Sequence, residues 1–204
     1  MKLALLVVLA AVLAAGHPVA AAPGAQRFVI LPAESHVSYR VNETLIFENN
    51  RLNVAIGTTN AIQGDATIDR TNPRNSKIGT ITVDISQFKS DSERRDNAIR
   101  SRWLESRRFP TATFTPTSVQ GLPDTYTDGH ELSLQVTGQL KVRDVTKPVT
   151  FAVTLKLDGI VLTGTATTLI KMTEFGFDPP SIFGMLRAEN DVRLELRFAA
   201  RAAP

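Results

Sequence analysis

Alternation of apolar and polar residues is the strongest pattern in this chain, and it is clearest between residues 131 and 157. In the segment 131–142, apolar residues or glycine occupy every second position and polar residues the positions between. This is the period of an extended strand with one buried face. The alternation resumes in 148–157 after a polar turn at 143–147. The two segments therefore predict a β-hairpin.

Period two also governs most of the remaining chain. It predicts further extended segments at 26–31, 34–42, 61–69, 81–85, 111–117, 160–172 and 190–198. The stretch 43–59 breaks the pattern with Asn49-Asn50-Arg51 and Gly57, so we expect a looser excursion there, with room for short strand pieces.

The period changes once, after residue 90. Ser90-Asp91-Ser92-Glu93 has the spacing of a capping box, which predicts a helix that runs to about Leu104. Ala98, Ile99 and Trp103 would then share its inward side. We therefore predict an all-β fold: an antiparallel up-and-down barrel of about eight strands with one inserted short helix. A barrel of that size is wide enough to hold one small ligand.

The first 21 residues have the composition of a secretory signal peptide. Met1-Lys2 is a positive start, 3–15 is an apolar run, and small residues follow. Cleavage after Ala21 would leave a single domain at 22–204, and we expect a periplasmic protein, with secretion beyond the periplasm left open. The apolar run is shorter than the ~20 residues that cross a bilayer, so we expect no stable membrane insertion.

Composition excludes several kinds of site. The chain has no cysteine, which rules out disulfides, thiolate metal sites and a cysteine nucleophile. The formal net charge of +3 falls to +2 once Lys2 is removed with the leader, which gives no support for nucleic-acid binding.

Catalytic chemistry has little support. Only His36 and His130 would remain after cleavage. His36 and its neighbour Ser35 would face opposite sides of a regular strand, so they cannot form a proton relay. No metal-ligand spacing such as HExxH occurs. We therefore expect no enzyme activity, no catalytic residues, no bound metal and no cofactor.

Several motifs, in order along the chain, resemble those of the YceI family of periplasmic, lipocalin-like proteins. They are Glu34-Ser35-His36-Val37-Ser38-Tyr39-Arg40-Val41, Asp96-Asn97-Ala98-Ile99-Arg100-Ser101, Phe109-Pro110-Thr111-Ala112-Thr113-Phe114, Gly138-Gln139-Leu140 with Val145-Thr146-Lys147-Pro148-Val149, and Phe175-Gly176-Phe177. Two features depart from the family. Asp144 stands where glycine is usual in the family. Aspartate tolerates left-handed backbone angles, so the turn can still form. The excursion after the second strand is longer than the family's short connection.

The resemblance implies a lipocalin-like barrel whose apolar tunnel holds a long isoprenoid or another fatty amphiphile. Burial of about twenty carbons at ~0.8 kcal/mol each would contribute roughly 16 kcal/mol. An association cost of ~4–15 kcal/mol still leaves useful affinity. The resemblance also leaves a homodimer open.

Candidate tunnel residues are the large apolar side chains near the predicted helix and loops. They are Ile99, Trp103, Phe109, Phe114, Phe175, Phe177, Ile182, Phe183 and Met185. The alternative is that all of them are ordinary core. Arg94 and Arg95 are candidates for a rim that receives an anionic head group. Acidic residues are interleaved with these arginines, so a solvated helix face is the alternative.

Three classes of function follow from these patterns. The first is a carrier that sequesters a hydrophobic small molecule. The second is a stress-related or accessory protein whose packed barrel acts through its surface. An outer-membrane barrel is disfavoured, because one Trp and two Tyr are too few for aromatic girdles.

Overall fold

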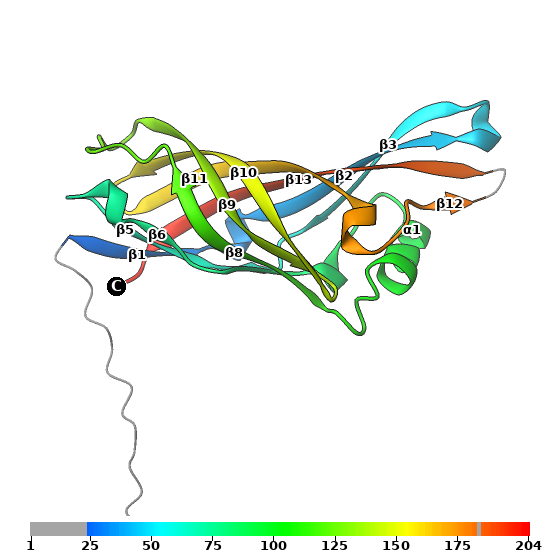
Figure 1. The fold of residues 1–204 in the computed structure, drawn as a ribbon, viewed down its shortest axis with the longest axis horizontal. Helices are drawn as coiled ribbons and strands as arrows, with labels where there is room; N and C mark the ends of the chain where they lie inside the picture. Colours follow the sequence, from blue (N-terminus) through cyan, green and yellow to red (C-terminus); the bar gives the residue numbers. More distant parts are fainter. Residues whose placement is uncertain (1–23, 183–184) are drawn as a thin grey trace, which may run out of the picture.

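The computed structural model describes residues 24–182 and 185–204, and within them thirteen strands form one antiparallel sheet (Figure 1). The strands are β1 (Ala25–Ile30), β2 (His36–Leu45), β3 (Arg51–Thr59), β4 (Ile62–Gln63), β5 (Asp65–Asp69), β6 (Lys77–Ile78), β7 (Ile81–Asp84), β8 (Thr111–Gln120), β9 (Glu131–Val142), β10 (Val145–Asp158), β11 (Val161–Lys171), β12 (Ser181–Ile182) and β13 (Leu186–Ala202). The predicted signal peptide, 1–21, and Phe183 lie outside the described residues.

Short helical segments connect the strands at several points. They are the α-helix α1 (Glu93–Ala98), the π-helical turn η5 (Ile99–Trp103), and the 3-10 turns η1 (Pro32–Glu34), η2 (Ile46–Glu48), η3 (Pro73–Asn75), η4 (Ile85–Gln87) and η6 (Met172–Phe175). The helix α1 and its π-helical continuation lie at one end of the molecule, beside the projecting β2–β3 hairpin (Figure 1).

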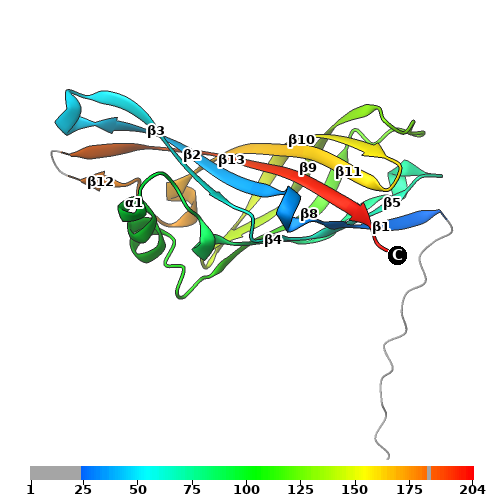
Figure 2. The same cartoon turned by 180° about the vertical axis from the view of Figure 1, so that it is seen from behind.

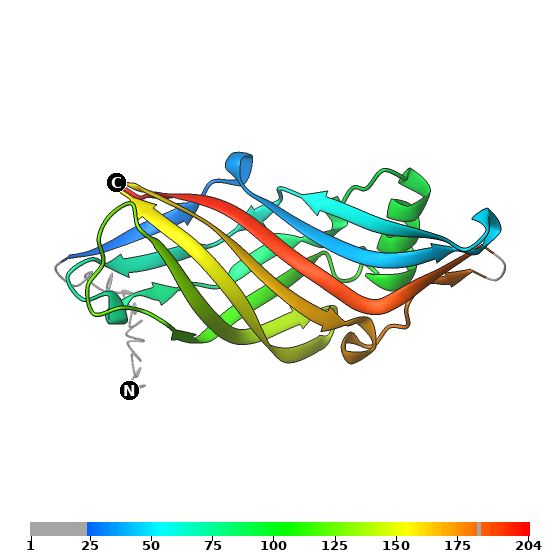
Figure 3. The same ribbon diagram turned by 90° about the horizontal axis from the view of Figure 1, so that it is seen from above.

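The long strand β13 is a central strand of the sheet, with partners along both of its sides. It pairs with β11 along one side, and with β2 and then β1 along the other (Figures 2 and 3). Strands β8 to β11 follow in chain order. The strand order ends in β4, which pairs with β7, and in β6, which pairs with β5 beside β1. The sheet therefore curls round on itself. The predicted antiparallel barrel with one short inserted helix is confirmed.

The stretch 43–59 is regular, so the expectation of a loose excursion is wrong. Strand β2 continues to Leu45, and Asn49 and Asn50 take left-handed φ angles of 56° and 60°, which turn the chain tightly into β3. The alternation in β3 is inverted, with small or polar residues inside and large apolar ones outside. This inversion is why the pattern concealed the hairpin.

The inserted helix begins later than its capping-box spacing suggested. Ser92, not Ser90, is the N-cap, and its hydroxyl accepts a hydrogen bond from the Arg95 N–H at 3.3 Å. Ser90 instead donates its hydroxyl to the buried carboxylate of Asp96 at 2.6 Å. The α-helix ends at Ala98, and the π-helical turn extends the helical segment to Trp103.

The β9–β10 hairpin turns through Arg143 and Asp144, as Val142 pairs with Val145. Arg143, not Asp144, is the left-handed residue, with φ 57°. Its guanidinium donates to the Trp103 carbonyl at 3.3 Å and forms an ion pair with Glu105. These contacts offset the strained backbone and tie the hairpin to the helical segment.

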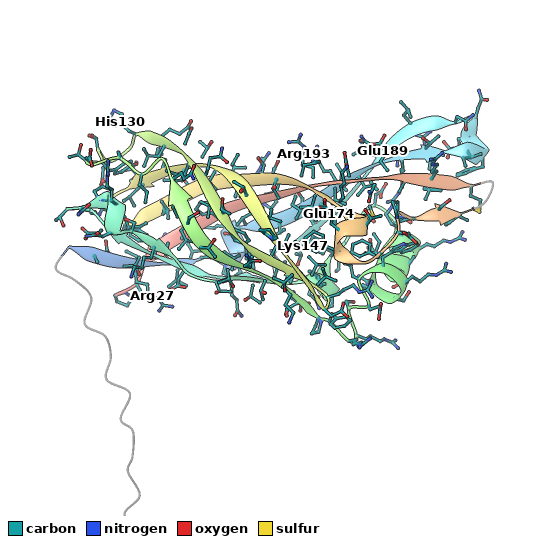
Figure 4. The ribbon with its side chains drawn as sticks, in the orientation of Figure 1. Arg27, His130, Lys147, Glu174, Glu189 and Arg193 are labelled. Atoms are coloured by element: carbon teal, nitrogen blue, oxygen red, sulfur yellow. The ribbon has the colours of Figure 1, made fainter. Side chains whose placement is uncertain are left out.

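Three buried apolar clusters lie inside the curl of the sheet. They centre on Phe28 at the β1 end, on Val136 in the middle, and on Phe175 near α1. Figure 4 shows Arg27, Lys147 and Arg193 on the outside of the sheet and His130 at the end opposite α1. The alternation predicted for β9 is confirmed, because its apolar positions are the inward ones.

We predict that Asp96→Ala destabilises the protein by about 1–3 kcal/mol. The substitution removes the acceptor for the Ser90 N–H, which lies 2.9 Å from the Asp96 carboxylate. The measurement is urea-induced unfolding followed by circular dichroism. Glu93→Ala, an exposed position of the same helix, is the control and should change stability much less. Equal effects of the two substitutions would contradict this role for Asp96.

Candidate functional site

A cavity of about 600 Å³ occupies the interior of the curled sheet. Its wall includes residues of all three buried clusters, from Phe28 at the β1 end through Val136 to Tyr39 near α1. Most of the lining side chains are apolar. The interior that the alternation pattern predicted is therefore hollow along much of its length.

Inward positions of the strands build the middle of the cavity wall. Phe114 of β8 reaches the wall beside Gly138 of β9, where a Cβ atom would lie 2.7 Å from the Phe114 ring. The same ring packs edge-on against Phe151 of β10, with centroids 4.8 Å apart. Glycine at 138 therefore leaves the room that Phe114 occupies.

The helical segment forms part of the cavity wall at one end of the molecule. Ala98, Ile99 and Trp103 border it from α1 and the π-helical turn. In that turn the Leu104 N–H donates to the Ile99 carbonyl at 2.8 Å, a spacing of five residues. Arg100 anchors this segment, because its guanidinium donates a hydrogen bond to the Phe88 carbonyl at 3.0 Å. Short π-helical turns of this kind are frequent at functional sites.

A partly buried ion pair lies in the largely apolar wall near α1. The Glu43 side chain is only 5% exposed, and its Oε1 lies 3.0 Å from Nη2 of Arg95. Asn53 donates to the same oxygen at 2.6 Å, and Asp91 forms a second ion pair with Arg95. Two carboxylates therefore more than balance the single positive charge of Arg95.

Tyr39 lies beside this ion pair and borders the cavity. Its ring packs edge-on against Phe88 at a centroid distance of 5.2 Å, and it fits over Gly57, where any Cβ would clash with it. Burial raises the pKa of Tyr39 to about 12, the negative charge of Asp96 contributes in the same direction, and Arg95 opposes both. The phenol is therefore a neutral hydrogen-bond donor at physiological pH.

The cavity reaches the molecular surface at the α1 end. Phe47, Ile182 and Met185 border it and are also exposed to solvent. The Ile46 N–H donates to the Met185 carbonyl at 2.8 Å, which holds the tip of the β2–β3 hairpin against the start of β13. We call these three bordering side chains the apolar mouth.

The structure places most of the predicted tunnel residues on the cavity wall. Those that border it are Ile99, Trp103, Phe114, Phe177, Ile182 and Met185. Phe175 and Phe109 do not border it. Phe175 is fully buried in the cluster near α1, and the Arg108 guanidinium stacks on the Phe109 ring at 4.8 Å. Phe183 falls outside the described residues. Contact with a ligand stays a prediction for all of them.

The two candidate rim residues differ in their surroundings. Arg94 and Arg95 both border the cavity, but Arg94 is exposed whereas Arg95 is held in the ion pairs described above. Sequence reasoning missed Tyr39, Glu43 and Phe47. The parity of Tyr39 with Val37 and Val41 was a usable signal. The sequence offered no signal for Phe47, because the β2–β3 hairpin on which it lies was not predicted.

Within the described residues, no group of three or more His, Cys, Asp or Glu side chains is placed to hold a metal ion. His36 and His130 are both exposed, on β2 and in the turn before β9. None of the helices in 24–182 and 185–204 has the length and apolar character needed to span a bilayer.

Known proteins share this fold. The chain resembles the solved structure of BcnA from Burkholderia cenocepacia with a TM-score of 0.62 and 18% identity, over 83% of this chain and 98% of BcnA. It resembles a polyisoprenoid binding domain from Saccharophagus degradans, implicated in plant cell wall breakdown, with a TM-score of 0.64 and 12% identity, over 87% of this chain and 99% of that domain. At these identities the likeness concerns the fold.

Sequence relatives match over shorter regions. A UPF0312 protein of Pseudomonas putida is 31% identical over 130 residues, which cover 61% of this chain and 64% of the relative. Protein YceI of Escherichia coli O157:H7 is 37% identical over 95 residues, which cover 46% of this chain and 45% of the relative. The matches thus span less than two thirds of either relative. The YceI-like domain, however, matches residues 28–200, nearly all of the described sheet, and the chain therefore belongs to the YceI-like family.

Proposed function

We propose that this protein binds a long-chain isoprenoid or another lipid-like amphiphile in its cavity and carries it through the periplasm. The observation that carries the proposal is the apolar cavity of about 600 Å³, which extends from Phe28 to the apolar mouth. Its volume is within the ~300–1,000 Å³ of typical small-molecule sites. The polyisoprenoid binding described for the Saccharophagus domain, which shares the fold, supports the choice of ligand class.

The nature of the wall supports binding rather than catalysis. An apolar chain gains ~0.8 kcal/mol for each buried CH₂ group without any directed contact. The hollow interior also counts against the alternative of a packed barrel that acts only through its surface. A periplasmic location is part of the proposal and rests on the signal-peptide composition of residues 1–21.

We place the polar head group of the ligand at the α1 end. Polar groups in the wall there include Tyr39, Glu43 and Arg95, with Ser92 and Arg94 beside them. Because Glu43 and Asp91 already balance Arg95, an uncharged polar head group fits this end better than a phosphate. Arg94, which is exposed at the same end, remains the candidate for contact with an anionic group.

The direct test is native mass spectrometry of the purified protein, followed by organic extraction. We expect a mass increment from a co-purifying lipid, or uptake of an added isoprenoid or fatty acid by the empty protein. A protein that is empty as purified and takes up neither compound would exclude the carrier role.

Ala166→Phe should block the cavity at its middle. Ala166 borders the cavity from β11, within the cluster that contains Val136. We expect the affinity for a ligand of about twenty carbons to fall at least about tenfold, while one of about eight carbons is affected less. Fluorescence titration measures both affinities. Leu169→Phe, on the exposed side of the same strand, should leave both unchanged. An unchanged long-chain affinity in Ala166→Phe would contradict a continuous tunnel.

Tyr39→Phe tests the placement of the head group. Loss of one neutral hydrogen bond should weaken binding of a long-chain alcohol about 3- to 10-fold. Binding of an alkane of the same length should not change. Because burial raises the pKa of Tyr39 to about 12, the affinity of the unmodified protein should be constant from about pH 6 to pH 9. If both ligands lose affinity equally, the head group is not at Tyr39.

A further inference from the structure

The outward side of β3 is apolar although no part of the described chain covers it. Leu52, Val54 and Ile56 are 81%, 48% and 36% exposed. Within residues 24–182 and 185–204, β2 is the only strand that forms a ladder with β3, so β3 is a sheet edge. Exposed edge strands with apolar side chains are templates for pairing with another strand.

Hydrogen bonding at one end of β3 defines which backbone groups face the open edge. Thr58 donates its N–H to the Lys89 carbonyl at 2.8 Å and accepts from the Lys89 N–H at 2.9 Å, on the side away from β2. Backbone groups alternate in direction along a strand. The N–H and C=O groups of Leu52, Val54 and Ile56 therefore point to the open edge as well.

The open edge has two boundaries and a midpoint. Thr58 is occupied by Lys89 at one end, and the chain turns away at Asn50, with φ 60°, at the other. Val54 lies midway between these two residues. A strand that pairs antiparallel with this edge around a twofold axis at Val54 would fit between both boundaries without displacing either.

We propose that β3 of a second copy of this chain occupies this edge, in antiparallel register around a twofold axis at Val54. Val54 then pairs with its own counterpart, and Leu52 lies opposite Ile56 of the partner subunit. Three hydrogen-bonded pairs would contribute about six backbone hydrogen bonds. The apolar side chains of both copies meet on one face, as an isologous interface requires.

Several features of β3 favour this occupant. Residues 51–59 contain no proline, lysine or acidic residue, which are among the devices that keep edge strands apart. In the proposed register Arg51 lies opposite Gly57 of the partner subunit, so no like charges oppose each other. A contact through one strand edge is smaller than the ~800 Å² per partner of stable complexes, so we expect a reversible dimer with micromolar affinity.

A single introduced cysteine tests the register, because the natural chain has none. Hydrogen-bonded antiparallel pairs have Cα atoms ~5.5 Å apart, within the ~4.4–6.8 Å that disulfides span. Val54→Cys should therefore form a covalent dimer under mild oxidation. In the same register two copies of Leu52 are ~13 Å apart, so Leu52→Cys should cross-link far less. Leu169→Cys, 59% exposed on β11, is the control and should also cross-link little.

Sedimentation of the full mature chain tests the dimer itself. We expect a concentration-dependent monomer–dimer equilibrium that Val54→Lys, which sets two lysines opposite each other, shifts at least tenfold toward monomer. Leu169→Lys should leave the equilibrium unchanged. Circular dichroism checks that both variants fold. The proposal is overturned by a monomer at ~100 µM, by equal cross-linking at all three cysteines, or by binding of lipid vesicles at this face in place of self-association.

Discussion

The hollow interior depends on one constraint: most inward positions of the curled sheet must be apolar, yet the sum of the side chains must be too small to fill the space. Period-two alternation satisfies the first condition. Alanine at inward positions satisfies the second, because Ala55, Ala112, Ala166, Ala188 and Ala200 all border the cavity. Larger aliphatic residues at these positions would close it, since protein interiors otherwise pack to near-crystalline density.

The sequence predicted those elements whose signal is local. The bounds of β9 follow from strict alternation, and the structure begins and ends that strand at the same residues. The helix was placed correctly but its cap was not, because Ser90 and Ser92 both have suitable spacing. In the structure the Asp96 carboxylate accepts hydrogen bonds from the Ser90 N–H and hydroxyl, and the Ser92 hydroxyl accepts from the Arg95 N–H. A spacing rule does not show these contacts.

The polar part of the candidate site could not be predicted for a different reason. Arg95 and Glu43 are 52 residues apart in sequence, and their pairing depends on how the hairpin and α1 come together in three dimensions. Charged residues on a short helix ordinarily indicate a solvated face. Here one arginine turns inward against a buried carboxylate, while its neighbour Arg94 stays exposed. Side-chain pattern alone does not distinguish these two arginines.

The inverted alternation of β3 accounts both for space inside the cavity and for the apolar outer surface of this strand. Its inward side must leave room for Tyr39 and for the ion pair, which explains the small or polar residues Asn53, Ala55 and Gly57 there. A strand also needs residues that favour extended backbone, and the β-branched residues Val and Ile are among them. Because the inward positions of β3 must be small, Val54 and Ile56 occupy outward positions. They expose apolar surface there, which monomeric proteins rarely leave uncovered in contiguous patches. The space required inside thus creates the self-complementary edge outside.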